Sequence, residues 1–217
     1  MAVVDSDQRT ESILQVDSLE RRFGSHVVFS GIDVQLGAGE RLALRGPNGS
    51  GKTTLLRCIA GTVTPSGGRV LVAGHPSPSR AARRSTGVSL SQERSFYLRL
   101  SGLENLLFFA GMRGFRRRRA AQIVRELEDE LLLHEILRLR VDRCSTGMIQ
   151  QLSFARALLG QPRLLLLDEP TRSLDDAAAD RFWGALDRRP ALALVIATHR
   201  VEDVANCQST LVMEPHP

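Results

Sequence analysis

The segment from Gly46 to Thr54 constrains the fold of this 217-residue chain more than any other part of the sequence. It matches the pattern G-x-x-x-x-G-K-[ST], which is typical of a phosphate-binding loop. Its residues are Gly46, Pro47, Asn48, Gly49, Ser50, Gly51, Lys52, Thr53 and Thr54. Because glycines at 46, 49 and 51 allow unusual backbone angles, N–H groups can turn inward and approach an anion closely. We therefore expect these residues to bind the phosphates of a nucleotide.

The two polar side chains at the end of the motif have separate predicted roles. Lys52 can place a positive charge on the β- and γ-phosphates, and the Thr53 hydroxyl can bind Mg²⁺. A helix that begins at this point would add the positive end of its dipole. The motif thus predicts a site for a magnesium-bound triphosphate.

The residues on either side of the loop support this interpretation. Residues 40–45 alternate polar and apolar side chains, as a strand does, whereas Leu55, Leu56, Ile59 and Ala60 recur at helical spacing. Gly61 can end that helix. The alternative is a glycine-rich turn that matches by chance, and the strand–loop–helix pattern argues against it.

Composition limits the class of protein. Hydrophobic residues make up 42% of the chain, which indicates a globular domain rather than a disordered one. No apolar run reaches the roughly 18 residues that span a bilayer, and the polar start does not resemble a signal peptide. We expect a single domain over residues 1–217 in the cytoplasm. The net charge of +5 does not distinguish phosphates, acidic lipids and nucleic acid as partners.

The order of elements predicts an α/β fold. Strands are expected at residues 13–16, 27–29, 32–36, 69–72, 87–91, 164–168, 191–198 and 210–213, and helices at residues 151–159 and 175–188. Between them, residues 100–142 have helical periodicity with apolar positions such as Leu106 and Leu127. We expect a helical insertion at approximately residues 93–150. The arginine run 116–119 within it is expected to be a solvated helix start rather than a lipid or nucleic-acid contact.

Two acidic residues follow the most apolar predicted strand. Four consecutive leucines, 164–167, suit a strand that is buried on both faces of a parallel sheet. Asp168 and Glu169 come at its carboxyl end, where open α/β sheets bind ligands. Asp168 is placed to hold Mg²⁺, and Glu169 to orient or deprotonate an attacking water. A solvated helix cap is the alternative, and the phosphate loop upstream favours the functional role.

Three further residues are candidates because of their positions. Gln92 follows a predicted strand, so its amide could contact the metal or the water. His199 follows another and could donate a hydrogen bond to the γ-phosphate. Phe23 could stack on the base of the nucleotide. Each also has a purely structural interpretation, since a lone phenylalanine is normally a core residue.

These residues in this order resemble the ATP-binding-cassette (ABC) family of transport ATPases over about residues 13–213. Gln92 resembles the Q-loop glutamine, residues 104–106 the E-N-L sequence, residues 173–175 the D-loop, and His199 the switch histidine. Residues 144–148 (C-S-T-G-M) stand at the signature position, and Gln150 continues its pattern. Phe23 falls where the family places an adenine-stacking aromatic residue. The resemblance implies a phosphate-loop NTPase (RecA-like) core with a mainly parallel sheet, an N-terminal antiparallel β subdomain and an α-helical insertion.

The resemblance also implies a head-to-tail dimer of two cassettes, either identical or sister subunits. In the family, ATP bound at one loop is covered by the signature of the partner, so Ser145 and the Gly147 amide would meet the partner's γ-phosphate.

Two positions in this sequence depart from the family's signature pattern. Thr146 stands where glycine is usual, and a β-branched residue there would resist φ > 0 and add bulk near a phosphate. Ile149 replaces a common basic residue. We expect slowed hydrolysis, with Ser145, Gly147 and Glu169 retained.

Three functions compete at this stage. The leading one is the ATP-hydrolysing subunit of a membrane transporter, most similar to multidrug, polyketide or haem exporters, with the transmembrane permease in a separate chain. That permease would dock on the insertion and hold the cassette at the inner face of the membrane. The second is a soluble ABC ATPase that acts on nucleic acid or ribosomes, although we expect no nucleic-acid partner. The third, a kinase-like enzyme, would leave residues 145–152, 173–175 and His199 unexplained.

Overall fold

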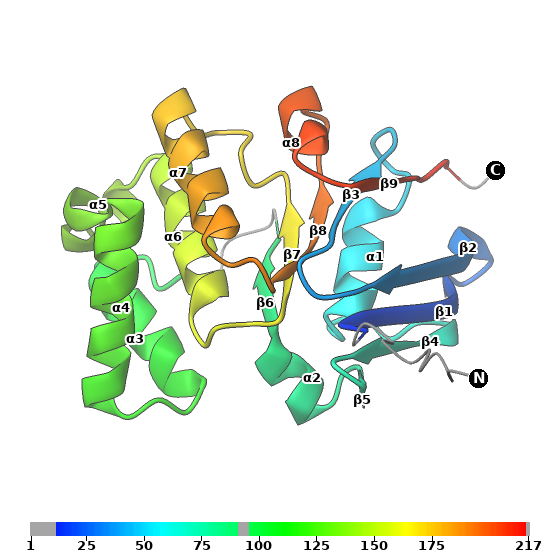
Figure 1. Cartoon of the computed structure of the whole chain (residues 1–217), viewed down its shortest axis with the longest axis horizontal. Helices are drawn as coiled ribbons and strands as arrows, with labels where there is room; N and C mark the ends of the chain where they lie inside the picture. Colours follow the sequence, from blue (N-terminus) through cyan, green and yellow to red (C-terminus); the bar gives the residue numbers. More distant parts are fainter. Residues whose placement is uncertain (1–11, 91–95, 216–217) are drawn as a thin grey trace, which may run out of the picture.

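A parallel sheet lies in the middle of the molecule, with a group of helices on one side and α1 and a second sheet on the other (Figure 1). The structure is a computed structural model that describes residues 12–90 and 96–215. The parallel sheet has the strand order β6-β7-β8-β3-β9. Its strands are β3 (Arg41–Arg45), β6 (Thr86–Ser89), β7 (Leu164–Asp168), β8 (Ala193–Ala197) and β9 (Ser209–Val212). The prediction of an α/β fold with a mainly parallel sheet is thereby confirmed.

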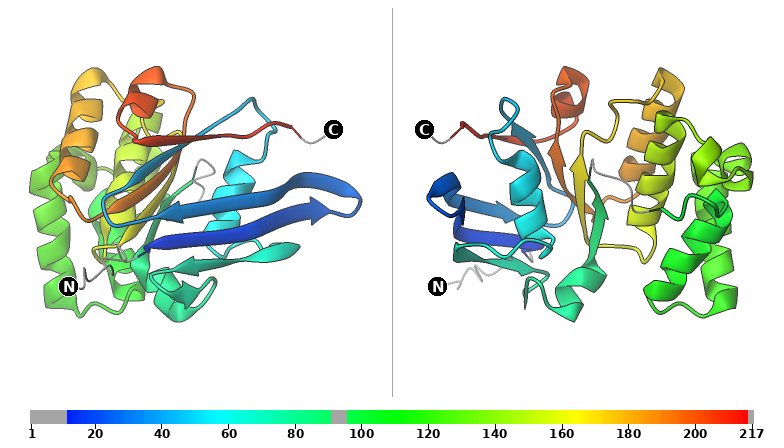
Figure 2. Two further views of the ribbon diagram at one scale, coloured as in Figure 1. Left: turned by 45° about the vertical axis from the view of Figure 1, so that its right-hand side comes forward. Right: turned by 180° about the vertical axis from the view of Figure 1, so that it is seen from behind.

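A second, antiparallel sheet lies on one side of the parallel sheet (Figure 2). It has the order β2-β1-β4-β5. Its strands are β1 (Leu14–Phe23), β2 (His26–Leu36), β4 (Gly67–Val72) and β5 (His75–Pro76). Helix α1 (Lys52–Ile59) lies between the two sheets in the ribbon views. The predicted antiparallel subdomain is therefore present.

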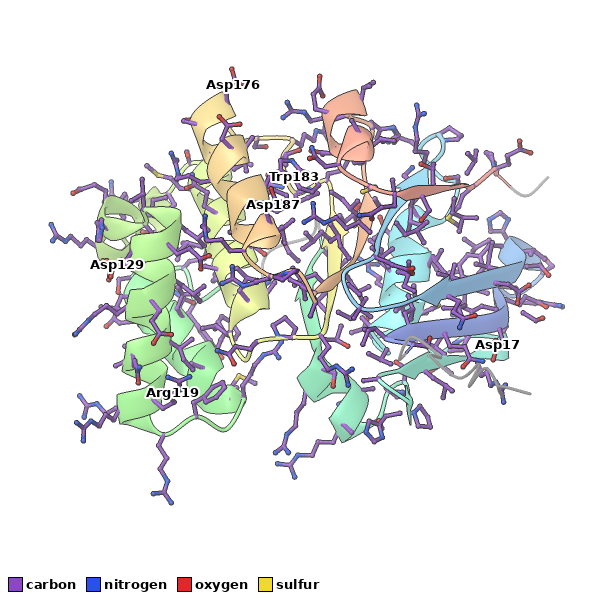
Figure 3. All side chains as sticks on the ribbon, viewed as in Figure 1. Asp17, Arg119, Asp129, Asp176, Trp183 and Asp187 are labelled. Atoms are coloured by element: carbon purple, nitrogen blue, oxygen red, sulfur yellow. The ribbon has the colours of Figure 1, made fainter. Side chains whose placement is uncertain are left out.

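Helices cover the other side of the parallel sheet (Figure 1). They are α3 (Gly102–Met112), α4 (Arg117–Leu131), α5 (His134–Arg138), a 3₁₀ turn (Val141–Arg143), α6 (Thr146–Leu158) and α7 (Asp176–Asp187). Two short helices, α2 (Arg80–Ser85) and α8 (Val201–Ala205), lie elsewhere. Helices α3 to α6 thus lie in the part of the sequence for which we predict an insertion. Arginines 116–119 are all exposed at the start of α4, and Figure 3 shows Arg119 at the outer edge of the molecule.

Alternation along β7 explains why four leucines occur in a row. Leu165 and Leu167 belong to the core cluster on the helical side of the sheet, whereas Leu164 and Leu166 belong to the cluster on the α1 side. All four are fully buried. Because successive side chains of a strand point to opposite faces, a strand covered on both faces must be apolar at every position. This strand therefore forms the boundary between the two cores.

The sequence-based boundaries are wrong at several places. Strand β1 extends to Phe23, well beyond the expected end at residue 16, because it pairs with β2 as far as Phe23. Residues 27–36 form one strand rather than two, because β2 pairs with β1 along its whole length and bulges absorb the irregularity near Gly31. Helix α6 begins at Thr146 rather than Gln151, because the Ser145 hydroxyl accepts a hydrogen bond from the Met148 N–H at 3.2 Å. Helices α2, α5 and α8 were not predicted, since each is too short to show a periodic apolar face.

Among the residues that the structure describes, no helix combines the length and the apolar character needed to cross a membrane.

Candidate functional site

The phosphate-binding motif forms the connection from β3 to α1, as predicted. Gly46 has φ of 147°, and a Cβ atom on it would lie 2.1 Å from the Met213 carbonyl oxygen. Only glycine fits so close to that backbone. At the other end, Lys52 is the first residue of α1, so the N–H groups of the first helical turn lie directly after the loop. The loop therefore presents backbone donors and a helix N-terminus together.

Two side chains of the loop can bind an anion through hydrogen bonds. Lys52 is 8% exposed, and its ammonium donates hydrogen bonds to the carbonyl oxygens of Gly46 at 2.6 Å and Pro47 at 2.9 Å. The Ser50 hydroxyl is fully buried and has no hydrogen-bond partner among the described residues. Since an unpaired buried hydroxyl is unfavourable, this group is stabilised by any phosphate oxygen that reaches it. The residues present thus fit a nucleotide phosphate.

Oxygen atoms from two distant segments meet next to the loop. The Thr53 hydroxyl donates a hydrogen bond of 2.7 Å to a carboxylate oxygen of Asp168, at the end of β7. A hydroxyl, a single carboxylate and the phosphates of a substrate form the kind of oxygen ligand set that Mg²⁺ takes up in phosphoryl-transfer sites. The pair could therefore hold the metal that the sequence predicts. The described residues contain no cluster of three or more histidine, cysteine or acidic side chains that would serve as a separate metal site.

Glu169 lies beside this pair in an unusual environment. Its φ is 49°, in the left-handed region that residues other than glycine seldom adopt. Burial raises the pKa of its carboxyl, and neighbouring Asp168 acts in the same direction, whereas the charges of His199 and Arg172 lower it. The imidazole Nε2 of His199 lies 3.5 Å from a Glu169 carboxylate oxygen. A carboxyl with a raised pKa next to a phosphate loop has the character of a general base.

One cavity of about 460 Å³ joins most of the predicted residues. Its lining includes Phe23, Asn48, Gly49, Gly51, Lys52, Thr53, Thr54, Asp168, Glu169 and His199. Phe23 is 53% exposed at this cavity, and the Arg21 guanidinium lies 4.0 Å from the centre of its ring. The lining also contains His26 and Arg172, which sequence reasoning missed because neither belongs to a recognisable spacing.

Ser145 and Gly147 do not line this cavity. They lie at the N-terminus of α6, where Ser145 caps the helix. Thr146, the first residue of α6, lines an adjacent cavity of about 500 Å³ together with Glu169 and Ser173. Gln92 lies outside the described residues, so its predicted contacts with metal and water stay predictions.

The expected backbone strain at Thr146 is wrong. The residue has helical geometry and is not among those with positive φ. Because the first position of a helix accepts threonine without a left-handed conformation, only the added bulk of the side chain distinguishes it from glycine here. The side chain is exposed.

Comparisons with known proteins agree with this geometry. Residues 29–172 match the family described as "ABC transporter". The chain is 33% identical over 210 residues to "Uncharacterized ABC transporter ATP-binding protein YdbJ" of Bacillus subtilis, which covers 94% of this chain and 67% of the relative. It is 36% identical over 208 residues to "Nod factor export ATP-binding protein I" of Rhizobium meliloti, covering 93% and 61%. The chain thus spans about two thirds of the length of these curated relatives.

Solved structures share the fold. A dimeric, post-hydrolysis ATP-binding cassette bound to ADP and Pi superposes with a TM-score of 0.82 at 20% identity, covering 94% of this chain and 97% of that one. A cassette named cbiO1 from Clostridium perfringens, described as part of the ABC transporter complex cbiONQ, gives a TM-score of 0.78 at 24% identity, covering 95% and 88%.

Proposed function

The chain belongs to the ABC transporter family of ATP-binding and ATP-hydrolysing proteins, and from this premise we propose that it drives export through a membrane chain by hydrolysing MgATP. The observation that carries the proposal is a cavity lined by the phosphate loop, Asp168, Glu169 and His199. These residues come from loops that follow β3, β7 and β8 of the parallel sheet. Because the carboxyl ends of neighbouring parallel strands meet at one edge, the groups converge on one substrate.

The reaction transfers the γ-phosphoryl group of ATP to water. The N–H groups after the loop and the Lys52 ammonium hold the phosphates, and Lys52 exchanges its two carbonyl partners for phosphate oxygens. Thr53 and Asp168 would hold Mg²⁺, which would neutralise charge on the phosphates. Glu169 orients the water and accepts its proton as the bond from oxygen to phosphorus forms and the bond to ADP breaks. His199 donates a hydrogen bond to the γ-phosphate.

A second cassette completes the site in this proposal. Ser145 and Gly147 do not line the chain's own phosphate loop cavity, although a serine at a helix N-terminus is well suited to bind a phosphate. In a head-to-tail pair, each signature covers the ATP held by the other subunit. With an identical companion the two ATP sites are related by a two-fold axis, and with a sister cassette the same head-to-tail arrangement again closes the dimer.

The proposed docking face for the membrane chain lies on the helical insertion. Large apolar side chains are unusually exposed along one stretch: Tyr97 at 50%, Leu98 at 55%, Phe108 at 41% and Met112 at 71%. Beside them, a cavity of about 720 Å³ separates α2 from α3 and α6. Large apolar side chains that are exposed in one region of the surface are typical of a protein interface. We assign it to a permease at the inner face of the membrane, and the named relatives that export Nod factor favour an exporter.

Replacing Glu169 by glutamine tests the catalytic part of this proposal. We expect Glu169→Gln to lower ATP turnover by about 10²-fold or more, because the amide cannot accept the proton. ATP affinity, measured with a fluorescent nucleotide, should stay within about twofold, because the phosphate loop is unchanged. Glu135→Gln, on the exposed surface of α5, is the matched control and should turn over ATP like the wild type. Equal turnover in the wild type and Glu169→Gln would remove Glu169 from its proposed role.

The partner is tested by the response of ATP turnover to added macromolecules. We expect the rate to rise with a membrane protein that co-purifies with the chain and not with DNA or RNA. Met112→Glu should abolish that rise while basal turnover stays unchanged, since Met112 lies outside the phosphate loop cavity. A rise with nucleic acid alone would contradict the assignment.

A further inference from the structure

The main chain at Glu169 is held in place by three hydrogen bonds. The Glu169 N–H donates to the Ala197 carbonyl of β8 at 2.8 Å, and the Glu169 carbonyl accepts from the Arg172 N–H at 3.3 Å. The same carbonyl accepts from the side-chain amide of Gln150 at 2.5 Å. Since the left-handed conformation of a non-glycine residue is unfavourable, it persists only where its surroundings enforce it. The Gln150 bond is the one of the three that a side chain provides.

Gln150 belongs to α6, which begins within the signature segment 144–148 and is called the signature helix below. It lies just after the Ser145 cap and the first turn of α6. The same turn touches the segment that follows Glu169, because a Cβ atom on Gly147 would lie 2.5 Å from the Ser173 carbonyl oxygen. Gln150, Glu169 and Ser173 also line one cavity of about 500 Å³. The start of α6 and the loop after β7 are therefore in direct contact at two points.

We propose that Gln150 is a positioning residue that couples the signature helix to the catalytic carboxylate of its own subunit. The proposal rests on the proposed function, in which the N-terminus of α6 binds the phosphate of the nucleotide held by the partner. When a phosphate binds at this helix N-terminus, α6 shifts and Gln150 moves with it. The hydrogen bond from the Gln150 amide then moves the main chain of Glu169. The nucleotide in the partner's site thereby controls the orientation of the carboxylate that acts in this chain's own site.

The Gln150 hydrogen bond and the strain at Glu169 are comparable in free energy, so the loss of this bond can change the conformation of Glu169. The cost of a left-handed non-glycine residue and the net gain from one hydrogen bond to a buried carbonyl are of the same order. Loss of the Gln150 bond leaves the Glu169 conformation supported by backbone bonds alone. A carboxylate displaced by a fraction of an ångström orients water less well, without a change in the phosphate loop.

The test compares Gln150→Leu with Gln151→Leu in the full chain. Gln151 is the next residue of the same helix and lines a different, small cavity away from Glu169, so it is the matched control. We expect Gln150→Leu to lower kcat roughly 10- to 100-fold while KM and the ATP affinity change less than about twofold. Gln151→Leu should retain the wild-type kcat. Gln150→Glu, which keeps the shape but cannot donate the bond when ionised, should behave like Gln150→Leu and serves if the latter fails to fold.

A second measurement does not depend on catalysis. Hydrogen exchange of the backbone amides of Glu169, Thr171 and Arg172, without nucleotide, should be about fivefold or more faster in Gln150→Leu than in Gln151→Leu, because the main chain of Glu169 has lost one of its hydrogen bonds. Equal exchange in the two variants, or equal kcat, would overturn the proposal. So would a parallel loss of kcat and affinity, which would indicate a merely structural role. If the wild type hydrolyses no ATP, the proposed function fails, and the exchange comparison still decides on the Gln150 link.

Discussion

At the scale of single residues, the Glu169 carboxyl is mostly buried, whereas the neighbouring His199 side chain is exposed. His199 is half exposed, whereas the Glu169 side chain is 15% exposed. Burial raises the pKa of the Glu169 carboxyl because the charged form loses solvation. The group is therefore protonated over a wider acidic range than an ordinary glutamate.

This shift predicts the acid side of the pH profile. Because Glu169 accepts a proton only when ionised, kcat/KM should fall as the pH drops through its raised pKa, which lies above the ordinary value of about 4.3. The profile of kcat/KM reports groups in the free protein, so steady-state turnover across acidic pH measures it. Glu135→Gln should show the same fall in kcat/KM at acidic pH as the wild type. An apparent pKa of this fall at or below the ordinary glutamate value would contradict the prediction.

Thr146 offers a prediction about the signature itself. Its helical backbone removes strain as a reason for slow hydrolysis, so bulk at the exposed start of α6 is the remaining one. We expect Thr146→Gly to raise the turnover of the dimer, and Thr146→Ala to raise it nearly as much because both remove the branched side chain. A rise with glycine alone would indicate that backbone freedom matters after all. An unchanged or lower rate in both variants would show that Thr146 does not slow hydrolysis.

At the scale of elements, the helical insertion is fastened to the core through α4 and α7. Glu130 of α4 accepts hydrogen bonds from both terminal nitrogens of Arg189, each at 2.7 Å, and from the Arg188 side chain at 3.0 Å. On the opposite side of α7, Arg41 of β3 pairs with Asp187 at 2.8 Å and lies 5.8 Å from the Trp183 ring centre. Figure 3 shows Trp183 and Asp187 together on this helix. Helix α7 is thus held from both sides.

We expect Glu130→Gln to lower the free energy of unfolding at neutral pH by about 1–2 kcal/mol, because the forked, charge-assisted contact is lost. For a chain of this size the melting temperature should fall by roughly 2–8 °C in a calorimetric scan. Glu126→Gln, also on α4, is the control, since its pair with Arg119 is exposed and 3.9 Å long, and should change little.

The same contact has a predicted pH dependence. Arg189, followed by Arg188, lowers the pKa of Glu130 in the folded chain. A lowered folded pKa stabilises the fold above the unfolded value and loses this effect as the pH falls through the folded value. The gap in stability between wild type and Glu130→Gln should therefore narrow on acidification below about pH 4. A gap that widened would mean that the ion pair is not its cause.

At the scale of the whole molecule, the proposed function divides each ATP site between two chains. The phosphate loop and Glu169 line one cavity, and the capped start of α6 lies outside it. We expect Glu169→Gln with MgATP to sediment as a dimer, because bound ATP joins the two faces and is not consumed. Adding Ser145→Arg should restore the monomer while ATP binding persists.

A matched substitution separates dimer loss from loss of a helix cap. Ser101 caps α3 with the same type of hydrogen bond that Ser145 makes at α6. Glu169→Gln combined with Ser101→Arg should therefore still form the ATP-dependent dimer. If both arginine variants were monomeric, the signature face would lose its proposed place in the contact.

The amino-acid sequence by itself determined the phosphate loop, the buried strand before Asp168 and Glu169, and the alternation of strands and helices around them. These features depend on local chemistry, since glycine permits the loop backbone and runs of leucine require burial on both faces. Pairing between distant segments decided the rest. The contact of Thr53 with Asp168, the single strand of β2 and the start of α6 each depend on a partner or a cap that periodicity does not reveal.

The link between Gln150 and Glu169 belongs to the same class. Nothing in the spacing of the two residues brings a helix and a strand end together, and neither residue type favours a left-handed backbone. The parallel sheet places the end of β7 against the first turn of α6, and an amide there can bond a carbonyl that the strained residue presents. Local preferences act over a few residues, whereas the conformation of a catalytic side chain depends on neighbours that only the packed fold supplies.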